Sequence, residues 1–243
     1  MNGKAVLVTG GSRGIGAAIA LAMAGAGADV AITYTANEAA AKEVVRGIEA
    51  LGRRGVAVRA DAGDVGDAAG SVDWAAQTFG RLDVLVNNAG AGVLGPLAGL
   101  TLADVDRVLA VNVRGAFLAS QAAAGHMGQG GRIITIGTCM TQRVPGPGGT
   151  LYAMSKSALT GLTKALAREL GGRGITANIV HPGPVDTDMN PADGPYADPQ
   201  AAMTALGRFG RPEEIAATVA FLAGDGAAYI TGSEFSVDGG HAA

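Results

Sequence analysis

The stretch Thr9-Gly10-Gly11-Ser12-Arg13-Gly14-Ile15-Gly16 joins a short apolar run at residues 5–8 to an alanine-rich segment at about 14–26. The apolar run is typical of a buried strand and the alanine-rich segment of a helix. Glycines between them let the backbone turn tightly and approach a pyrophosphate, and a helix N-terminus offers free N–H groups and the positive end of its dipole. The stretch predicts a dinucleotide site, although a glycine-rich turn without a ligand is the simpler alternative.

The same alternation of short apolar runs and longer helical patterns continues along the chain. It predicts strands at 5–8, 30–34, 56–60, 84–86, 132–136, 175–180 and 233–237, and helices at 14–26, 38–51, 65–79, 103–127, 152–170 and 212–223. Apolar strands separated by helices indicate an α/β fold with a parallel sheet covered on both faces. No linker interrupts the pattern, so we expect one domain over 1–243. An irregular stretch at 185–200 contains three prolines and is interpreted as part of a substrate lid at about 186–206.

Composition narrows the function classes. The 243 residues carry 18 basic and 21 acidic side chains, a net charge of −3, and no basic block, so neither nucleic acid nor an anionic membrane is an expected partner. The single Cys excludes a disulfide framework and suits a reducing compartment. The three His lie far apart in sequence and no metal site is expected. Because no signal peptide or membrane span is recognised, we expect a soluble cytoplasmic protein.

The glycine spacing is Thr-Gly-x-x-x-Gly-x-Gly rather than Gly-x-Gly-x-x-Gly. This variant resembles the short-chain dehydrogenase/reductase family, in its short single-domain branch. The resemblance implies a Rossmann-like, doubly wound sheet of seven parallel strands in the order 3-2-1-4-5-6-7. It is closest in kind to 3-oxoacyl-carrier-protein reductases and related carbonyl reductases, which are mostly homotetramers.

Two features of the sequence predict NADP(H) rather than NAD. A carboxylate after the second strand would bind the adenosine ribose and repel a 2′-phosphate, but Tyr34 and Thr35 stand there and no acidic residue follows until Glu38. Arg13, in the glycine turn, supplies a guanidinium that can reach a 2′-phosphate. In the family this combination accompanies NADP(H). The alternative is that Arg13 is only a solvated surface charge.

Further motifs match the family's cofactor site. Asp61 corresponds to its acidic residue at the adenine ring, and Asn87-Asn88-Ala89-Gly90 to the motif lining the adenosine side. His181-Pro182-Gly183-Pro184-Val185-Asp186-Thr187 corresponds to its Pro-Gly motif and the Thr that contacts the nicotinamide carboxamide and the phosphate. The expected cofactor-binding residues are Gly10, Ser12, Arg13, Gly14, Ile15, Gly16, Tyr34, Thr35, Asp61, Ala62, Asn88, Ala89, Gly90, Val111, Tyr152, Lys156, Pro182, Gly183, Val185 and Thr187.

Tyr152 and Lys156 are four residues apart, which places a phenol and an ammonium on one face of a helix. A free Tyr has a pKa of about 10, and a neighbouring cation is expected to lower it toward the working range of a general acid or base. Alone, such a pair is a weak signal, because exposed Tyr-x-x-x-Lys pairs are common on helices.

The resemblance adds two partners to this pair. Asn112 matches the Asn that helps to hold a water in the proton relay, and Thr138 stands where the family usually has a catalytic Ser. Thr keeps the hydroxyl but its methyl group restricts χ1; Thr141 is the alternative for this role. Asn112, Thr138, Tyr152 and Lys156 thus resemble the family's tetrad. Cys139 has no base near it in sequence and is interpreted as structural or pocket-lining.

The expected activity is NADP(H)-dependent interconversion of a small-molecule ketone or aldehyde with its alcohol. One alternative is a nucleotide-binding regulatory protein with little turnover, because the stretch Asp186-Thr187-Asp188-Met189-Asn190-Pro191 resembles a family subgroup that contains a cyclic-dinucleotide binder. A dehydratase or epimerase is a third possibility. We expect a homotetramer, with a homodimer as the alternative; the alanine-rich helix at 103–127 offers a face for either.

Overall fold

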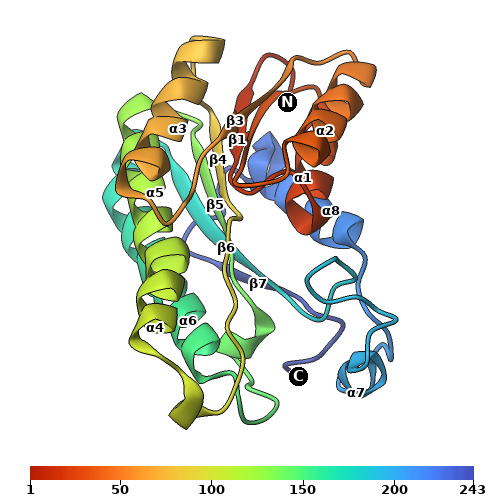
Figure 1. Cartoon of the computed structure of the whole chain (residues 1–243). Helices are drawn as coiled ribbons and strands as arrows, with labels where there is room; N and C mark the ends of the chain where they lie inside the picture. The colour runs from red at the N-terminus through yellow and green to blue at the C-terminus, as the bar shows by residue number, and fades with distance from the viewer.

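The computed structural model describes residues 1–243 and contains one seven-stranded parallel sheet in the order β3-β2-β1-β4-β5-β6-β7 (Figure 1). The predicted strand order and Rossmann-like architecture are therefore confirmed. The strands are β1 (Ala5–Val8), β2 (Asp29–Tyr34), β3 (Gly55–Arg59), β4 (Val84–Asn87), β5 (Arg132–Ile136), β6 (Thr176–Pro182) and β7 (Glu234–Val237). The helices are α1 (Gly14–Gly25), α2 (Glu38–Ala50), α3 (Val65–Phe79), α4 (Leu102–Leu109), α5 (Ala116–His126), α6 (Thr150–Leu170), α7 (Ala197–Ala202) and α8 (Pro212–Ala223).

Helices cover both faces of the sheet. Figure 1 shows α1, α2 and α8 on one face and α3, α4, α5 and α6 on the other. Each face has its own hydrophobic cluster, and successive strand residues alternate between the two: Val6 and Val8 belong to one cluster and Leu7 to the other. Because both faces are covered, the strands read as continuous apolar runs.

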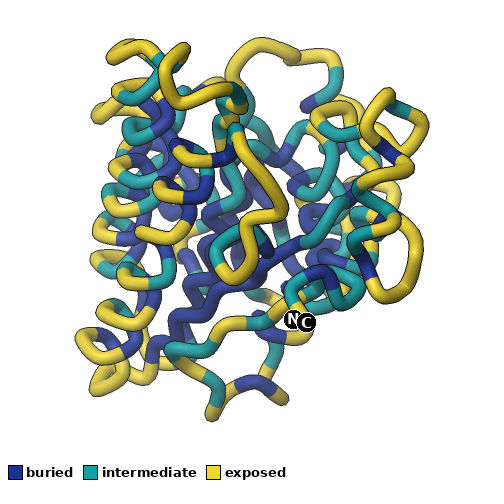
Figure 2. The backbone as a smooth tube through the Cα atoms, turned by 90° about the horizontal axis from the view of Figure 1, so that it is seen from below, coloured by how far each residue is buried: buried dark blue, intermediate teal, exposed yellow.

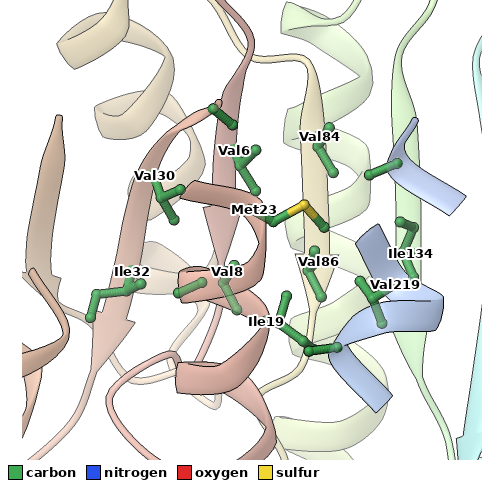
Figure 3. Packing of buried hydrophobic residues seen from close by; sticks show 14 of the residues in the cluster. Val6, Val8, Ile19, Met23, Val30, Ile32, Val84, Val86, Ile134 and Val219 are labelled. Atoms are coloured by element: carbon green, nitrogen blue, oxygen red, sulfur yellow. The ribbon is translucent and has the colours of Figure 1, made fainter. Parts of the chain in front are cut away.

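Side chains from the strands interlock with two helices on the α1 face. Val8 and Val86 lie near Ile19 and Met23 of α1 (Figure 3). Val219 of α8 lies beside Ile134 in the same cluster. All of these side chains are almost completely buried. At a typical 1.5–3 kcal/mol for each fully buried large apolar side chain, this layer holds α1, and with it the glycine turn, firmly on the sheet.

The single helix predicted over 103–127 is interrupted. It consists of α4, a π-helical segment at Ala110–Gly115, and α5. A hydrophobic pattern does not reveal one extra residue in a turn, and such π segments occur frequently at functional sites. The irregular stretch predicted at 185–200 contains the start of the short helix α7, which the sequence pattern did not indicate.

The solvent exposure of the residues follows the arrangement of the sheet between two layers of helices. The central strands are buried, whereas the outer helix faces and most connecting loops are exposed (Figure 2). None of the helices is both long enough and apolar enough to cross a membrane. Because all seven strands are parallel, their carboxyl ends share one edge of the sheet, where ligands of open α/β folds bind.

Candidate active site

The glycine turn after β1 forms a cradle that only glycine permits. Gly10 has a φ of +63°, in the left-handed region, and a Cβ on Gly16 would lie 2.4 Å from the Gly10 carbonyl oxygen. The turn is held from the side by Asn88, whose Nδ2 donates to the carbonyl oxygens of Thr9 and Gly10 at 2.9 and 3.0 Å. No side chain caps the N-terminus of α1. Its free N–H groups and dipole therefore suit a pyrophosphate.

A small, partly apolar cavity of about 10 Å³, with room for about one water molecule, lies beside this turn. Its lining combines residues at or just after the ends of β1, β2, β3 and β4 with residues of α3, the π-helical segment and α5. The lining residues are Thr9, Thr33, Ala60, Ala62, Asp67, Ala68, Ser71, Asn87, Ala89, Val111, Gly115, Ala116 and Ala119. The predicted residues Ala62, Ala89 and Val111 are among them. The cradle, with its left-handed Gly10 and the uncapped N-terminus of α1, shows that the residues present fit the pyrophosphate of a dinucleotide cofactor.

Asp61, predicted at the adenine ring, already has a partner. Arg107 of α4 contacts both of its carboxylate oxygens, at 3.2 and 2.9 Å, and the Gly63 N–H donates to the same carboxylate. The Arg107 side chain lowers the pKa of Asp61, with a smaller contribution from the Gly63 amide. Arg107 could not be predicted from the sequence, because the two residues are 46 positions apart and only the fold brings them together.

Arg13 extends from the glycine turn toward solvent. Its side chain is 63% exposed, and its Nη1 lies 4.0 Å from an oxygen of Asp188. Tyr34 is the last residue of β2, and Thr35 is exposed just beyond it. The neighbouring strand adds a cation that the sequence analysis missed: Arg59, the last residue of β3, donates from Nε to the Thr35 carbonyl oxygen. The Arg59 guanidinium therefore stands at the end of β2, whereas that of Arg13 lies near Asp188.

Tyr152, Lys156 and Thr138 come together where α6 crosses the carboxyl ends of β4 and β5. Tyr152 and Lys156 lie on the first turns of α6, and Thr138 follows β5. Lys156 Nζ donates to the Ile136 carbonyl oxygen at 2.8 Å. A Cβ on Gly90 would lie 3.3 Å from this nitrogen, so the loop after β4 borders the same space.

Ionisation of the pair differs from the sequence expectation. Burial raises the pKa of Tyr152, and hydrogen bonding to Thr138 only opposes this rise. Burial also lowers the pKa of Lys156 to about 8. The expected lowering of the Tyr152 pKa is thus wrong, because burial has the larger effect and the Lys156 ammonium is itself buried and bonds to a backbone carbonyl. At neutral pH the phenol is protonated and able to donate.

Asn112 lies in the π-helical segment and is almost completely buried. Its side chain accepts from Ala91 N at 2.8 Å and donates to the Ala91 carbonyl oxygen and to Ser155 Oγ, both at 2.9 Å. Asn112 therefore ties the loop after β4 to α6 between Tyr152 and Lys156. The sequence analysis overlooked Ser155, which the Tyr-x-x-x-Lys spacing could have indicated as a buried position.

The Pro-Gly motif after β6 lies opposite the glycine turn. A Cβ on Gly183 would lie 2.7 Å from Asp238 Cα, so the chain passes close to the end of β7 here. Thr187 lies against the glycine turn, since a Cβ on Gly14 would be 3.2 Å from its Cγ2. Pro182 ends β6, and Val185 pairs with Gly210 in an isolated parallel bridge. The predicted pyrophosphate and nicotinamide segments therefore face each other.

Cys139 is buried beside Thr138. Burial raises the pKa of its thiol to about 11, so the reactive thiolate is scarce at neutral pH. The interpretation of Cys139 as a structural or pocket-lining residue, rather than a nucleophile, is supported.

Comparison with known proteins agrees with this geometry. A protein-family model described as "Enoyl-(Acyl carrier protein) reductase" matches residues 10–242. A short chain dehydrogenase from Burkholderia cenocepacia, crystallised in complex with NADP, is 55% identical with a TM-score of 0.99, and the match covers 100% of this chain and 99% of that one. The chain belongs to the short-chain dehydrogenase/reductase family.

Two further relatives bear on function. A blue fluorescent protein from a metagenomic library, solved in complex with NADPH, is 52% identical with a TM-score of 0.98 and coverage of 100% of this chain and 99% of that one. A cyclic-di-GMP-binding biofilm dispersal mediator protein of Escherichia coli is 45% identical over 98% of this chain and 96% of its own length. Both similarities extend over nearly the whole chain.

Proposed function

We propose that this short-chain dehydrogenase/reductase uses NADP(H) to interconvert a ketone or aldehyde with its alcohol. The observation that carries the proposal is the convergence of Tyr152, Lys156 and Thr138 at the carboxyl edge of the sheet, beside the glycine cradle. Arg13 and the absence of a carboxylate after β2 support NADP(H), as do the NADP and NADPH in the similar solved structures.

When bound, the nicotinamide supplies or accepts the hydride. Tyr152, protonated because burial raises its pKa, donates its phenolic proton to the carbonyl oxygen during reduction. Thr138 donates a hydrogen bond to the same oxygen as negative charge develops there. Hydrogen bonding to Thr138, which opposes the rise in the Tyr152 pKa, then favours the phenolate left behind, until solvent returns the proton. Asn112 keeps the loop after β4 and α6 in fixed register during these steps.

The segment at about 186–206 is assigned as the lid of this site. Asp186 accepts from Ala192 N at 2.9 Å, and the side chains of Asn190 and Gln200 exchange two hydrogen bonds at 2.9 and 3.0 Å. These bonds make the segment a folded unit that includes α7. Closure of such a unit over bound cofactor would exclude water from the hydride-transfer step.

The test is NADPH oxidation by the purified wild type over a panel of aliphatic, cyclic and aromatic ketones and aldehydes, repeated with NADH. We expect turnover of at least one carbonyl class, a preference for NADPH of about tenfold or more, and a loss in kcat of about 100-fold or more in Tyr152→Phe. The same NADPH oxidation in wild type and Tyr152→Phe would contradict the proposal.

A second candidate is a regulatory protein that binds a cyclic dinucleotide with little turnover. The 45% identity to a cyclic-di-GMP-binding protein favours it. Titration calorimetry with cyclic di-GMP, with and without saturating NADPH, separates the two. Micromolar binding of cyclic di-GMP together with no carbonyl turnover over the panel would favour the regulatory function.

A further inference from the structure

A second buried polar group lies directly behind the proposed catalytic Thr138. His181, on β6, has a fully buried side chain. Its Nδ1 lies 3.3 Å from the Thr138 backbone nitrogen and 3.3 Å from Thr141 Oγ1, and its Nε2 lies 3.2 Å from Glu234 Oε2. His181 therefore connects β7, through β6, to the segment after β5 that carries Thr138.

The Nδ1 and Cε1 atoms of the imidazole ring approach the backbone just before Thr138. A Cβ on Gly137 would lie only 2.4 Å from His181 Nδ1, so this close approach requires glycine there. Gly137 N also donates to the Val180 carbonyl oxygen at 2.7 Å, which continues the β5–β6 pairing. The ring and the strand pairing together determine where the chain leaves β5.

The hydrogen-bond partners determine the tautomer of His181. The Thr138 backbone N–H can only donate, so Nδ1 is the acceptor and Nε2 carries the proton, which it donates to the Glu234 carboxylate. Glu234 also pairs with Lys164 Nζ at 2.7 Å. Thr141 Oγ1 donates either to the Thr138 carbonyl oxygen, at 3.0 Å, or to Nδ1.

We propose that His181 is a positioning residue: it holds the Thr138 backbone amide so that the Thr138 hydroxyl faces the Tyr152 phenol. This proposal rests on the proposed function, in which Thr138 binds the carbonyl oxygen. Without an acceptor, the buried Thr138 N–H seeks another partner, and the residue turns away from β6. The orientation of the hydroxyl then changes, although the cofactor cradle after β1 is untouched.

Two variants at this position separate the Thr138 contact from the Glu234 contact. His181→Asn places an amide oxygen near the position of Nδ1, where it can accept from Thr138 N–H, whereas His181→Leu offers no acceptor. Both variants lose the contact with Glu234. We expect kcat at saturating NADPH to fall at least tenfold in His181→Leu and to recover to within threefold of wild type in His181→Asn. The NADPH dissociation constant should stay within twofold in both.

Hydrogen exchange of the Thr138 amide provides a readout that does not depend on turnover. We expect exchange at Thr138 at least tenfold faster in His181→Leu than in His181→Asn, even if the wild type reduces no carbonyl and the proposed function fails. If His181→Leu does not fold, His181→Gln replaces it, because its Nε2 can keep the Glu234 contact while Thr138 N–H loses its acceptor. Equal kcat and equal Thr138 amide exchange in His181→Asn and in the variant without an acceptor (His181→Leu, or His181→Gln in its place) would overturn the proposal.

Discussion

Burial acts in opposite directions on the two ionisable groups of the proposed catalytic pair. It raises the pKa of Tyr152 and lowers that of Lys156 to about 8, because in each case it disfavours the charged form. At neutral pH the Tyr152 phenol is therefore protonated, and the Lys156 ammonium is charged although its burial removes it from water. The arrangement suits proton donation during reduction, and the desolvated ammonium lowers the stability of the fold at neutral pH.

Lys156→Met should remove the pH dependence that this buried ammonium gives to the free energy of unfolding. Lys156 has a pKa of about 8 in the folded state and its usual value of 10.5 in the unfolded state, so the unfolded state binds more protons between these values. Wild-type stability therefore rises with pH across this window, while that of Lys156→Met does not. Urea unfolding should show the variant losing about 2 kcal/mol relative to wild type between pH 7 and pH 9.5. The exposed Lys42→Met is the control and should show little change; a pH-independent difference for Lys156→Met would refute the assignment.

Thr138 replaces the Ser that the family usually carries. Its hydroxyl accepts weakly from Met140 N, at 3.4 Å, and opposes the rise that burial causes in the pKa of Tyr152. Thr138→Val keeps the shape and removes the hydroxyl, so kcat/KM for carbonyl reduction should fall at least about tenfold, or about 1.4 kcal/mol in transition-state stabilisation. Thr138→Ser should stay within about threefold of wild type. Steady-state kinetics decide this role, and an unchanged rate in Thr138→Val would exclude it.

The π-helical segment between α4 and α5 links the cofactor pocket to the catalytic residues. Asn112 faces α6, and three residues later Gly115 packs against the loop after β3: a Cβ there would lie 2.2 Å from the Ala62 carbonyl oxygen. Ala62 and Gly115 both line the small cavity beside the glycine turn. The interrupted helix thus places the Asn112 amide beside α6 and the close backbone contact of Gly115 beside the loop after β3.

Gly115→Ala should disturb this contact. The added methyl group has no room against backbone, so the free energy of unfolding should fall by about 2 kcal/mol and the NADPH dissociation constant should rise about tenfold. Gly125→Ala in α5 is the matched control: its Cβ meets no atom within 4 Å, so helix propensity alone makes it neutral or stabilising by about 0.5 kcal/mol. Denaturation and fluorescence titration measure both, and equal behaviour of the two variants would contradict the packing argument.

Across the molecule, the features that could be predicted from the sequence are those set by neighbouring residues in the chain. Residues 5–8 and 132–136 were predicted as strands with the observed bounds, because buried parallel strands are continuous apolar runs. The glycine turn and the Tyr152–Lys156 pair were recognisable because their spacing is local.

Long-range contacts could not be predicted from these local sequence patterns. The pairing of Arg107 with Asp61, the bond between Arg59 and Thr35, and the place of His181 behind Thr138 depend on how distant strands align at the sheet edge. The interruption at Ala110–Gly115 and the helix α7 arise from tertiary packing that propensity does not encode. The direction of the Tyr152 pKa shift depends on burial, which a four-residue spacing does not report.

Transfer of the hydride itself tests the account most directly. With a carbonyl substrate selected from the panel and NADPH deuterated at both C4 positions, mass spectrometry of the alcohol should show one deuterium on the carbinol carbon. The rate of its formation should be at least about 100-fold lower in Tyr152→Phe. An alcohol without deuterium, or labelled alcohol formed equally fast by Tyr152→Phe, would contradict hydride transfer with Tyr152 as the proton donor.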